Sequence, residues 1–293
     1  MMLSSYTNLA TKMLGEILDK HPELTKPVEL TLPKSGMGMT PKVYMSTVLF
    51  TTLIVYFSSL IGFWFVNMFF LNLDILMAVL ILIFLPSLLS IGVFLTGIFY
   101  PYQKAMSRRR DININLPFAL AHMGSIATSG IPPTAIFKLL AEFKEYGVLA
   151  EEMKKIVRNI EVFGLDPITA MREVAKRTPS EKFKQLLSGL ASTIEGGGDL
   201  KTYLKNAGEQ SLFMWRMKRQ KYIQQLSTYA EFYTGLLIAA PLFIISLFSV
   251  MYMIQPQVGG FDILRLMKLS TYLVIPILNL GFLLFLQVTQ VEM

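Results

Sequence analysis

The sequence has no cysteine and only two histidines, His21 and His122, which lie far apart in the chain. A chain without cysteine forms no disulfide and no thiolate metal site. Neither histidine has a partner at metal-ligand spacing. The chain also has no Gly-x-Ser-x-Gly nucleophile motif, and no Gly-Lys-Ser/Thr follows the glycine triplet at 196–198. We therefore expect no metal, no cofactor and no enzymatic activity.

Charged residues are scarce, at 16% of the chain, where about a quarter is usual. Between Lys42 and Lys104 the only charge is that of Asp74, and the later stretches 232–261 and 269–291 have none. A membrane-spanning helix needs about 20 consecutive, mostly apolar residues. The sequence therefore predicts an all-α, polytopic membrane protein with Asp74 in an external turn and with spans near 44–67, 76–100, 233–254 and 270–288.

The remaining charge predicts the orientation of the chain in the membrane. Residues 101–231 carry 20 Lys and Arg against 13 Asp and Glu. Because positive loops stay inside the cell, we expect this central domain and both termini on the cytoplasmic side of the cell (inner) membrane. The cluster at Arg108, Arg109 and Arg110 has two interpretations: a topology signal that also attracts anionic lipid headgroups, or a docking surface for an acidic partner. No aromatic residues interleave these basic ones, so we expect no nucleic-acid binding.

Residues 101–231 read as a compact, cytoplasmic six-helix bundle. A glycine followed by a helix start recurs at Gly130, Gly164 and Gly198. Expected helix starts are Asn115 as an N-cap, Asp166 as an N-cap, a Thr178–Glu181 capping box and Asp199 as an N-cap. The last helix has no breaker before Gly235, so we expect it to run directly into span three.

Apolar residues at 3-4 spacing define the expected inner faces of these helices. The expected core residues are Ile136, Leu139, Leu140 and Phe143, then Met153, Ile156, Ile160 and Phe163, then Ile168, Met171 and Val174, and finally Phe183, Leu186, Leu187, Leu190 and Ile194. We expect Glu151, Glu152, Lys154 and Lys155 to form an exposed stripe.

The flanking segments complete the predicted organisation. Residues 1–42 should form an N-terminal cytoplasmic segment with a short amphipathic helix near Met13–Leu18, followed by an extended link at Pro27 and Pro33. Residues 43–100 should hold the first two spans, 101–231 the helical domain, and 232–288 the last two spans.

One corner of the domain combines charge with backbone freedom. Glu195 and Asp199 flank the glycines Gly196, Gly197 and Gly198. Two interpretations stay open: a helix cap with its turn, or an exposed interaction loop whose glycines let a partner approach the backbone.

Three segments, 123–137, 164–171 and 190–204, carry a family resemblance. They resemble the type II secretion system F domain. Members of that family are inner-membrane platform subunits of type II secretion systems, type IV pili, tight-adherence pili and the archaeal flagellum. The family's Glu-x-x-Gly corner is matched at Glu195, Gly198 and Asp199, and its small-residue-Gly-hydrophobic-Pro corner at Ser129–Pro132.

The resemblance implies a platform that couples a hexameric secretion ATPase to the extraction of prepilin-like subunits from the bilayer. Secretion and type IV pilus members usually carry two such domains, so a homodimer or a paralogous F-domain partner is implied. Candidate ATPase or partner contacts are Arg108, Arg109, Arg110, Ser129, Gly130, Glu195, Gly196, Gly197, Gly198 and Asp199. The alternative is a membrane-anchored scaffold or a transporter component unrelated to filaments. The lack of charge inside the spans counts against transport.

Overall fold

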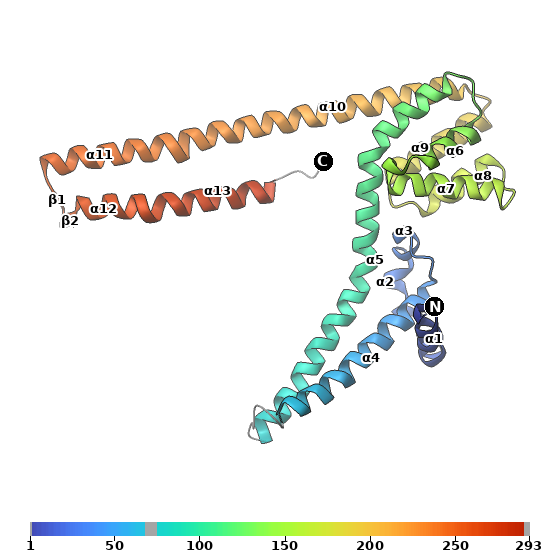
Figure 1. The fold of residues 1–293 in the computed structure, drawn as a ribbon, viewed down its shortest axis with the longest axis horizontal. Coiled ribbons are helices and arrows are strands. Elements are labelled where there is room, and N and C mark those ends of the chain that lie inside the picture. Colours follow the sequence, from blue (N-terminus) through green and yellow to red (C-terminus); the bar gives the residue numbers. More distant parts are fainter. Residues whose placement is uncertain (1, 68–74, 290–293) are drawn as a thin grey trace. The chain divides into compact units, whose positions relative to one another are not determined.

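The computed structural model describes residues 2–67 and 75–289, and these fold into helices with one short hairpin (Figure 1). The chain divides into two compact units, Met1–Glu209 and Gln210–Met293. Within the residues that the structure describes, four helical stretches are long and apolar enough to cross a membrane: Pro41–Val66, Leu80–Ala127, Leu200–Ile254 and Ile263–Thr289. The protein is a multi-pass membrane protein, as the charge-free stretches predicted. The predicted turn at Asp74 lies outside the described residues.

The N-terminal segment is more helical than predicted. The expected amphipathic helix is present as α1 (Met2–Lys20), but the expected extended link is wrong. Pro27 and Pro33 stand in the first turns of two short helices, α2 (Lys26–Glu29) and α3 (Leu32–Ser35). Proline fits there because the first turn of a helix leaves its N–H groups unbonded. Val28 and Leu32 are fully buried in a small core shared with α4 (Pro41–Val66).

Helix α5 (Ile75–Ala127) is a single helix of 53 residues, so the expected new helix at Asn115 is wrong. The amide of Asn115 does not cap a helix. It donates instead to the Asp111 carboxylate and the Tyr146 carbonyl, each at 3.4 Å. Pro86, Pro101 and Pro117 lie inside α5, where each removes one backbone donor without ending the helix.

The C-terminal part of α5 packs with the helices that follow it. These are α6 (Pro133–Glu142), the short helix η3 (Lys144–Tyr146), α7 (Val148–Glu161), α8 (Pro167–Arg177), α9 (Glu181–Glu195) and the first turns of α10 (Leu200–Phe232). Their shared core includes the predicted Ile136, Leu140, Met153, Ile156, Met171, Val174, Phe183, Leu186, Leu187 and Leu190. Ile160, Ile168 and Ile194 are only partly buried. Leu139 and Phe143 are exposed, so the prediction that these two residues lie in the core is wrong.

Two glycines allow α5 and α10 to approach closely inside this core. A Cβ atom at Gly208 would lie 2.9 Å from the carbonyl oxygen of Leu120, and one at Gly124 would lie 3.2 Å from that of Leu204. These neighbours are backbone atoms, which cannot move aside as a flexible side chain can. The bundle is therefore held together at a backbone-to-backbone contact that only glycine permits.

The second unit is a helical hairpin. Helix α10 passes without a break into the π-helix η4 (Tyr233–Ala239) and then α11 (Ala240–Ile254), as the lack of a breaker predicted. The strands β1 (Gln257–Val258) and β2 (Phe261–Asp262) form the turn. Helix α12 (Ile263–Leu269), the π-helix η5 (Ser270–Val274) and α13 (Ile275–Thr289) return. The Tyr233 hydroxyl donates to the Asn279 side chain at 3.1 Å, which joins the two arms.

Candidate functional site

The short connections of the bundle gather at two opposite ends. Consecutive helices run antiparallel, as the ion pairs Lys138–Glu161 and Arg172–Glu195 show. The connections 128–132, 162–166 and 196–199 therefore lie at one end, which we call the glycine end. The connections 143–147 and 178–180 lie at the other, which we call the base. The base surrounds α5 residues 108–115, the part of the bundle nearest to the membrane-spanning half of α5.

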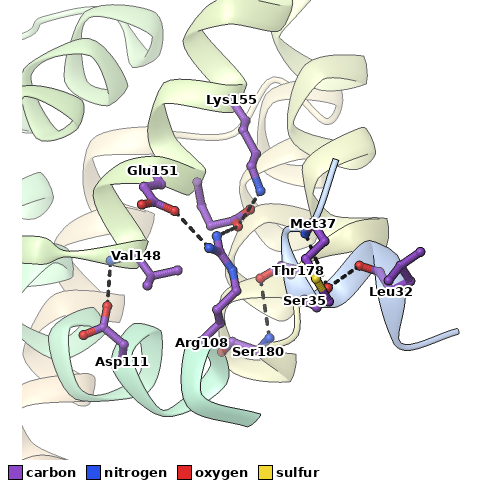
Figure 2. Close-up of polar contacts among 11 residues, drawn as sticks. Leu32, Ser35, Met37, Arg108, Asp111, Val148, Glu151, Lys155, Thr178 and Ser180 are labelled. Atoms are coloured by element: carbon purple, nitrogen blue, oxygen red, sulfur yellow. Dashed lines mark hydrogen bonds and ion pairs between the residues drawn. The ribbon is translucent and has the colours of Figure 1, made fainter. Parts of the chain in front are cut away.

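Polar side chains of α5 fasten the base (Figure 2). The Asp111 carboxylate accepts a hydrogen bond from the backbone N–H of Val148 at 2.6 Å. A residue of α5 therefore caps the start of α7. Gly147 makes room for it, because a Cβ there would lie 2.7 Å from the Asp111 oxygen. The Ser180 hydroxyl donates to the Asn113 side chain at 2.6 Å. A long membrane helix thus fixes the starts of two bundle helices.

The capping box expected at Thr178–Glu181 is wrong by two residues. Ser180 is the N-cap of α9, and its hydroxyl accepts from the backbone N–H of Phe183 at 3.2 Å. Thr178 ends α8 and accepts from the N–H of Ser180 at 3.4 Å. Both residue types favour caps, and the Ser180 hydroxyl also has a partner far away in sequence, Asn113.

Arg108 is an interior residue of the base. Its guanidinium donates to Glu151 and Glu152, each at 2.9 Å, and Lys155 lies 2.8 Å from Glu152 (Figure 2). The Arg108 side chain is 12% exposed and that of Glu152 only 2%, so the expected exposure of Glu152 is wrong. The backbone at Gly36 packs on the guanidinium, where a Cβ would lie 2.8 Å from the Cζ atom. Of the arginine cluster, only Arg109 and Arg110 are exposed.

The glycine end holds the other candidate residues. Gly130, Gly164 and Gly197 have positive φ angles of 75°, 67° and 65°, so the third turn uses Gly197, where the pattern suggested Gly198. Pro133, Ile194 and Leu200 line the same small apolar pocket, which brings the turn at Ser129–Gly130 close to the turn at Glu195–Asp199. All of these turn residues are exposed. The arginine cluster lies about 25 Å away along α5, at the base.

Sequence reasoning missed two exposed apolar residues at the glycine end. Val162 is 71% exposed and Phe163 63%. The 3-4 spacing placed Phe163 in the core, but α7 ends at Glu161, and the chain leaves the helical stripe before Phe163. The Arg158 guanidinium lies 5.8 Å from the Phe163 ring centroid, a cation–π contact at the surface. The combination of Val-Phe-Gly with the Asp-Pro helix start that follows was the available signal for an exposed corner.

The acidic residues of this end have structural partners. Glu195 accepts from Arg172 at 2.6 Å, which ties α9 to α8. Asp199 caps α10 by accepting from the N–H groups of Lys201 at 3.0 Å and Thr202 at 3.3 Å, and from the Thr202 hydroxyl. That hydroxyl is the main reason why the pKa of Asp199 lies below its ordinary value. The loop is a helix cap and is also exposed, and its role in an interaction stays a prediction.

These caps predict a loss of stability in acid. Hydrogen bonds from Thr169 lower the pKa of Asp166, the N-cap of α8, as those from Thr202 lower that of Asp199. A carboxylate with a lowered folded-state pKa stabilises the fold above its unfolded pKa, and this contribution is lost as pH falls through the folded value. We expect the unfolding midpoint to drop in that acid range. In the double variant Asp166→Asn/Asp199→Asn, the unfolding midpoint should fall less steeply with decreasing pH. Thermal unfolding in detergent at a series of pH values measures this. If the midpoint of the variant falls as steeply as that of the unmodified chain, these two caps are not the source of the acid sensitivity.

Among the residues that the structure describes, no group of three or more His, Cys, Asp or Glu side chains could hold a metal ion. The features that remain are two surfaces of different chemistry. The glycine end carries exposed glycine turns and the exposed apolar side chains Val162 and Phe163, whereas the base carries the exposed Arg109 and Arg110 close to the membrane-spanning half of α5.

Comparison with known proteins shows what this bundle is similar to. Residues 119–248 match the model of protein F of the type II secretion system. This part of the chain resembles a protein F domain. The match begins in α5, includes α6 to α10 and ends in α11, so the F domain contains the whole glycine end. The resemblance seen in the sequence is confirmed.

Archaeal relatives extend the likeness beyond the F domain. Flagella accessory protein J of Methanococcus voltae is 27% identical over 197 residues, 66% of this chain and 33% of the relative. Flagella accessory protein J of Methanocaldococcus jannaschii is 28% identical over 167 residues, 56% of this chain and 29% of the relative. An uncharacterized protein of the same organism is 28% identical over 193 residues, 65% of this chain and 32% of the relative. The chain thus spans about a third of the length of these relatives, and no solved structure matches it.

Proposed function

We propose that this protein is a platform subunit in the cell membrane for assembly of a type IV pilus-like filament. The observation that carries the proposal is an F domain joined to four candidate membrane spans. The names of two relatives, flagella accessory protein J, support an archaeal flagellum or pilus as the filament. The net positive charge of residues 101–231 supports a cytoplasmic F domain with both termini on the same side.

In this proposal the glycine end is the surface that a hexameric secretion ATPase contacts. It is the end of the bundle farther from the membrane-spanning half of α5, so a soluble partner reaches it without meeting lipid. Val162 and Phe163 are large, apolar and exposed there, and such residues are frequent anchors of protein interfaces. In this proposal Ser129, Gly130 and Glu195–Asp199, which lie at the same end of the bundle, supply the polar rim.

The base has a different role in this proposal. Arg109 and Arg110 follow the last apolar turns of span two closely, where basic side chains attract anionic headgroups by about 1 kcal/mol each. Arg108 is turned inward and does not take part. We therefore assign Arg109 and Arg110 to membrane lipids, and the acidic partner that the cluster first suggested is not needed.

The helix α5 offers a path for force. It joins the bundle directly to span two as one helix, and Asp111 and Asn113 fasten the bundle to it. A displacement of the glycine end by the ATPase would therefore reach the membrane through α5. In this scheme the spans then help to extract prepilin-like subunits, and a second F domain, from another copy or a paralogue, completes the platform.

Binding of the cognate secretion ATPase to the full chain in lipid nanodiscs tests the assignment of the glycine end. Phe163→Asp should weaken binding at least tenfold, which corresponds to about 1.4 kcal/mol, because it places a carboxylate in an apolar contact. Arg109→Glu is the matched control, since it also changes an exposed side chain to an acid but lies at the base. Surface plasmon resonance on both variants gives the two affinities.

The outcomes separate the alternatives. Weaker binding by Arg109→Glu with unchanged binding by Phe163→Asp would move the ATPase contact to the base. No binding by the unmodified chain, together with normal filaments after deletion of the gene, would contradict the platform function. A membrane-anchored scaffold without a filament would then be the better description.

A further inference from the structure

The N-terminal helix α1 carries an apolar stripe on its exposed side. Leu9 is 54% exposed, Met13 63% and Ile17 47%. Residues four positions apart lie on the same helix face, so these three side chains form one row. The opposite face is covered, because Gly15 and Leu18 are buried against the rest of the first unit.

Contacts at both ends fix how α1 lies along span one. Near its C-terminal end, the Asp19 carboxylate lies 2.7 Å from the Lys42 ammonium at the start of α4. Near its N-terminal end, the Tyr6 ring lies 5.4 Å from the Phe50 ring. Helix α1 therefore runs antiparallel to α4, and its N-terminal half is beside the apolar part of α4.

The positions of Lys42 and Phe50 along span one indicate how deep α1 lies in the membrane. Lys42 is the last charged residue before the apolar run of span one, and Phe50 lies eight residues, or about 12 Å, further along α4. One leaflet contributes about 15 Å of hydrocarbon. The N-terminal half of α1 is thus level with the part of α4 that enters this leaflet.

The neighbouring row of α1 is polar, which supports the same placement. Asn8, Lys12 and Glu16 each precede a residue of the apolar row by one position, and all three are exposed. The exposed side of α1 is thereby divided lengthwise into an apolar half and a charged half. A helix with this division lies at a membrane interface with its apolar half in the acyl chains and its charged half toward water.

We infer that α1 is embedded in the cytoplasmic-leaflet interface beside span one, with Leu9, Met13 and Ile17 in contact with lipid acyl chains. The exposed apolar row of α1 is in contact with the same bilayer that α4 crosses. Through α3 and Gly36, which packs on Arg108, the same segment connects this interfacial helix to the base of the bundle. The inference is independent of the filament and of the ATPase.

The lack of native cysteine allows a direct test, because a single introduced cysteine can be labelled with a nitroxide without background. The full chain is reconstituted in vesicles of phosphatidylcholine and phosphatidylglycerol. Met13→Cys is compared with Glu16→Cys, and Leu9→Cys with Lys12→Cys, so that each pair shares one region of α1. Phe57→Cys in α4, where the native side chain is 59% exposed, is the lipid reference, and Phe163→Cys is the water reference.

Electron paramagnetic resonance then measures how strongly oxygen and a nickel chelate relax each label. At positions 9 and 13, oxygen should dominate, as at position 57, because oxygen concentrates in lipid. At positions 12 and 16 the nickel chelate should dominate, as at position 163. Nickel-dominated labels at both 9 and 13 would overturn the inference. So would labels there that neither reagent reaches, since a protein partner would then cover the row. Because two pairs are tested, misfolding of one variant leaves the other to decide.

Discussion

Replacing Arg108 with leucine is expected to destabilise the helical bundle by about 3 kcal/mol, the usual cost of removing one partner from a buried ion pair. The reason is the environment of Glu152, whose side chain is 2% exposed and accepts from Arg108 at 2.9 Å. In the variant, Glu152 keeps only Lys155, which is itself partly exposed to water. Arg109→Leu is the matched control. It removes the same charge one residue further along α5, from an exposed position, and should change stability by less than about 0.5 kcal/mol.

Guanidinium unfolding in detergent, followed by circular dichroism, measures both variants. A double-mutant cycle with Glu152→Leu sharpens the result. Because leucine at both positions removes the unpaired charge, the double variant should be more stable than the sum of the two single changes predicts, by about 1 kcal/mol or more. If Arg108→Leu unfolds like the unmodified chain yet binds the ATPase less well, Arg108 is a docking residue, and our account of the base is wrong.

Replacing Gly208 with leucine is expected to be at least as severe, because it separates α5 from α10. Even the first added carbon would lie 2.9 Å from the Leu120 carbonyl oxygen and 3.1 Å from the Ala121 Cα atom. Overpacking of a core typically costs about 1–3 kcal/mol, and here the obstructing atoms belong to the backbone of a long helix. We expect a loss of about 3 kcal/mol and reduced incorporation of the protein into the membrane.

Gly92→Leu on α5 is the control for this second change. A Cβ at Gly92 meets no atom within 4 Å, and leucine gains about 1 kcal/mol over glycine in helix propensity. The control should therefore be as stable as the unmodified chain or slightly more stable in the same guanidinium titration. Equal stability of the Gly208 and Gly92 variants would show that α5 and α10 do not depend on this close contact.

Features that depend on local composition could be predicted from the sequence. The lack of charge over four long stretches predicted four spans, because only apolar side chains are stable in hydrocarbon. Asp166 and Asp199 were correctly predicted as caps, since each bonds to backbone N–H groups two or three residues ahead. The family resemblance was also visible in the sequence, because the glycine turns that carry it are short and local.

Which charged and apolar residues are buried depends on the packing of distant helices, and the sequence did not predict it. Glu152 was expected to be exposed to water, but it is buried beside its partner Arg108. Arg108 lies 44 positions earlier, on α5, so the local sequence around Glu152 gave no sign of this pairing. Phe163 was expected in the core and is exposed, because α7 ends two residues before it. From the sequence, the arginine cluster and the glycine turns were both predicted to contact the ATPase or another partner. The antiparallel arrangement of α5 to α10 instead puts them at opposite ends of the bundle. Pairings between distant segments depend on how helices pack, and helical periodicity carries no information about a partner in another helix.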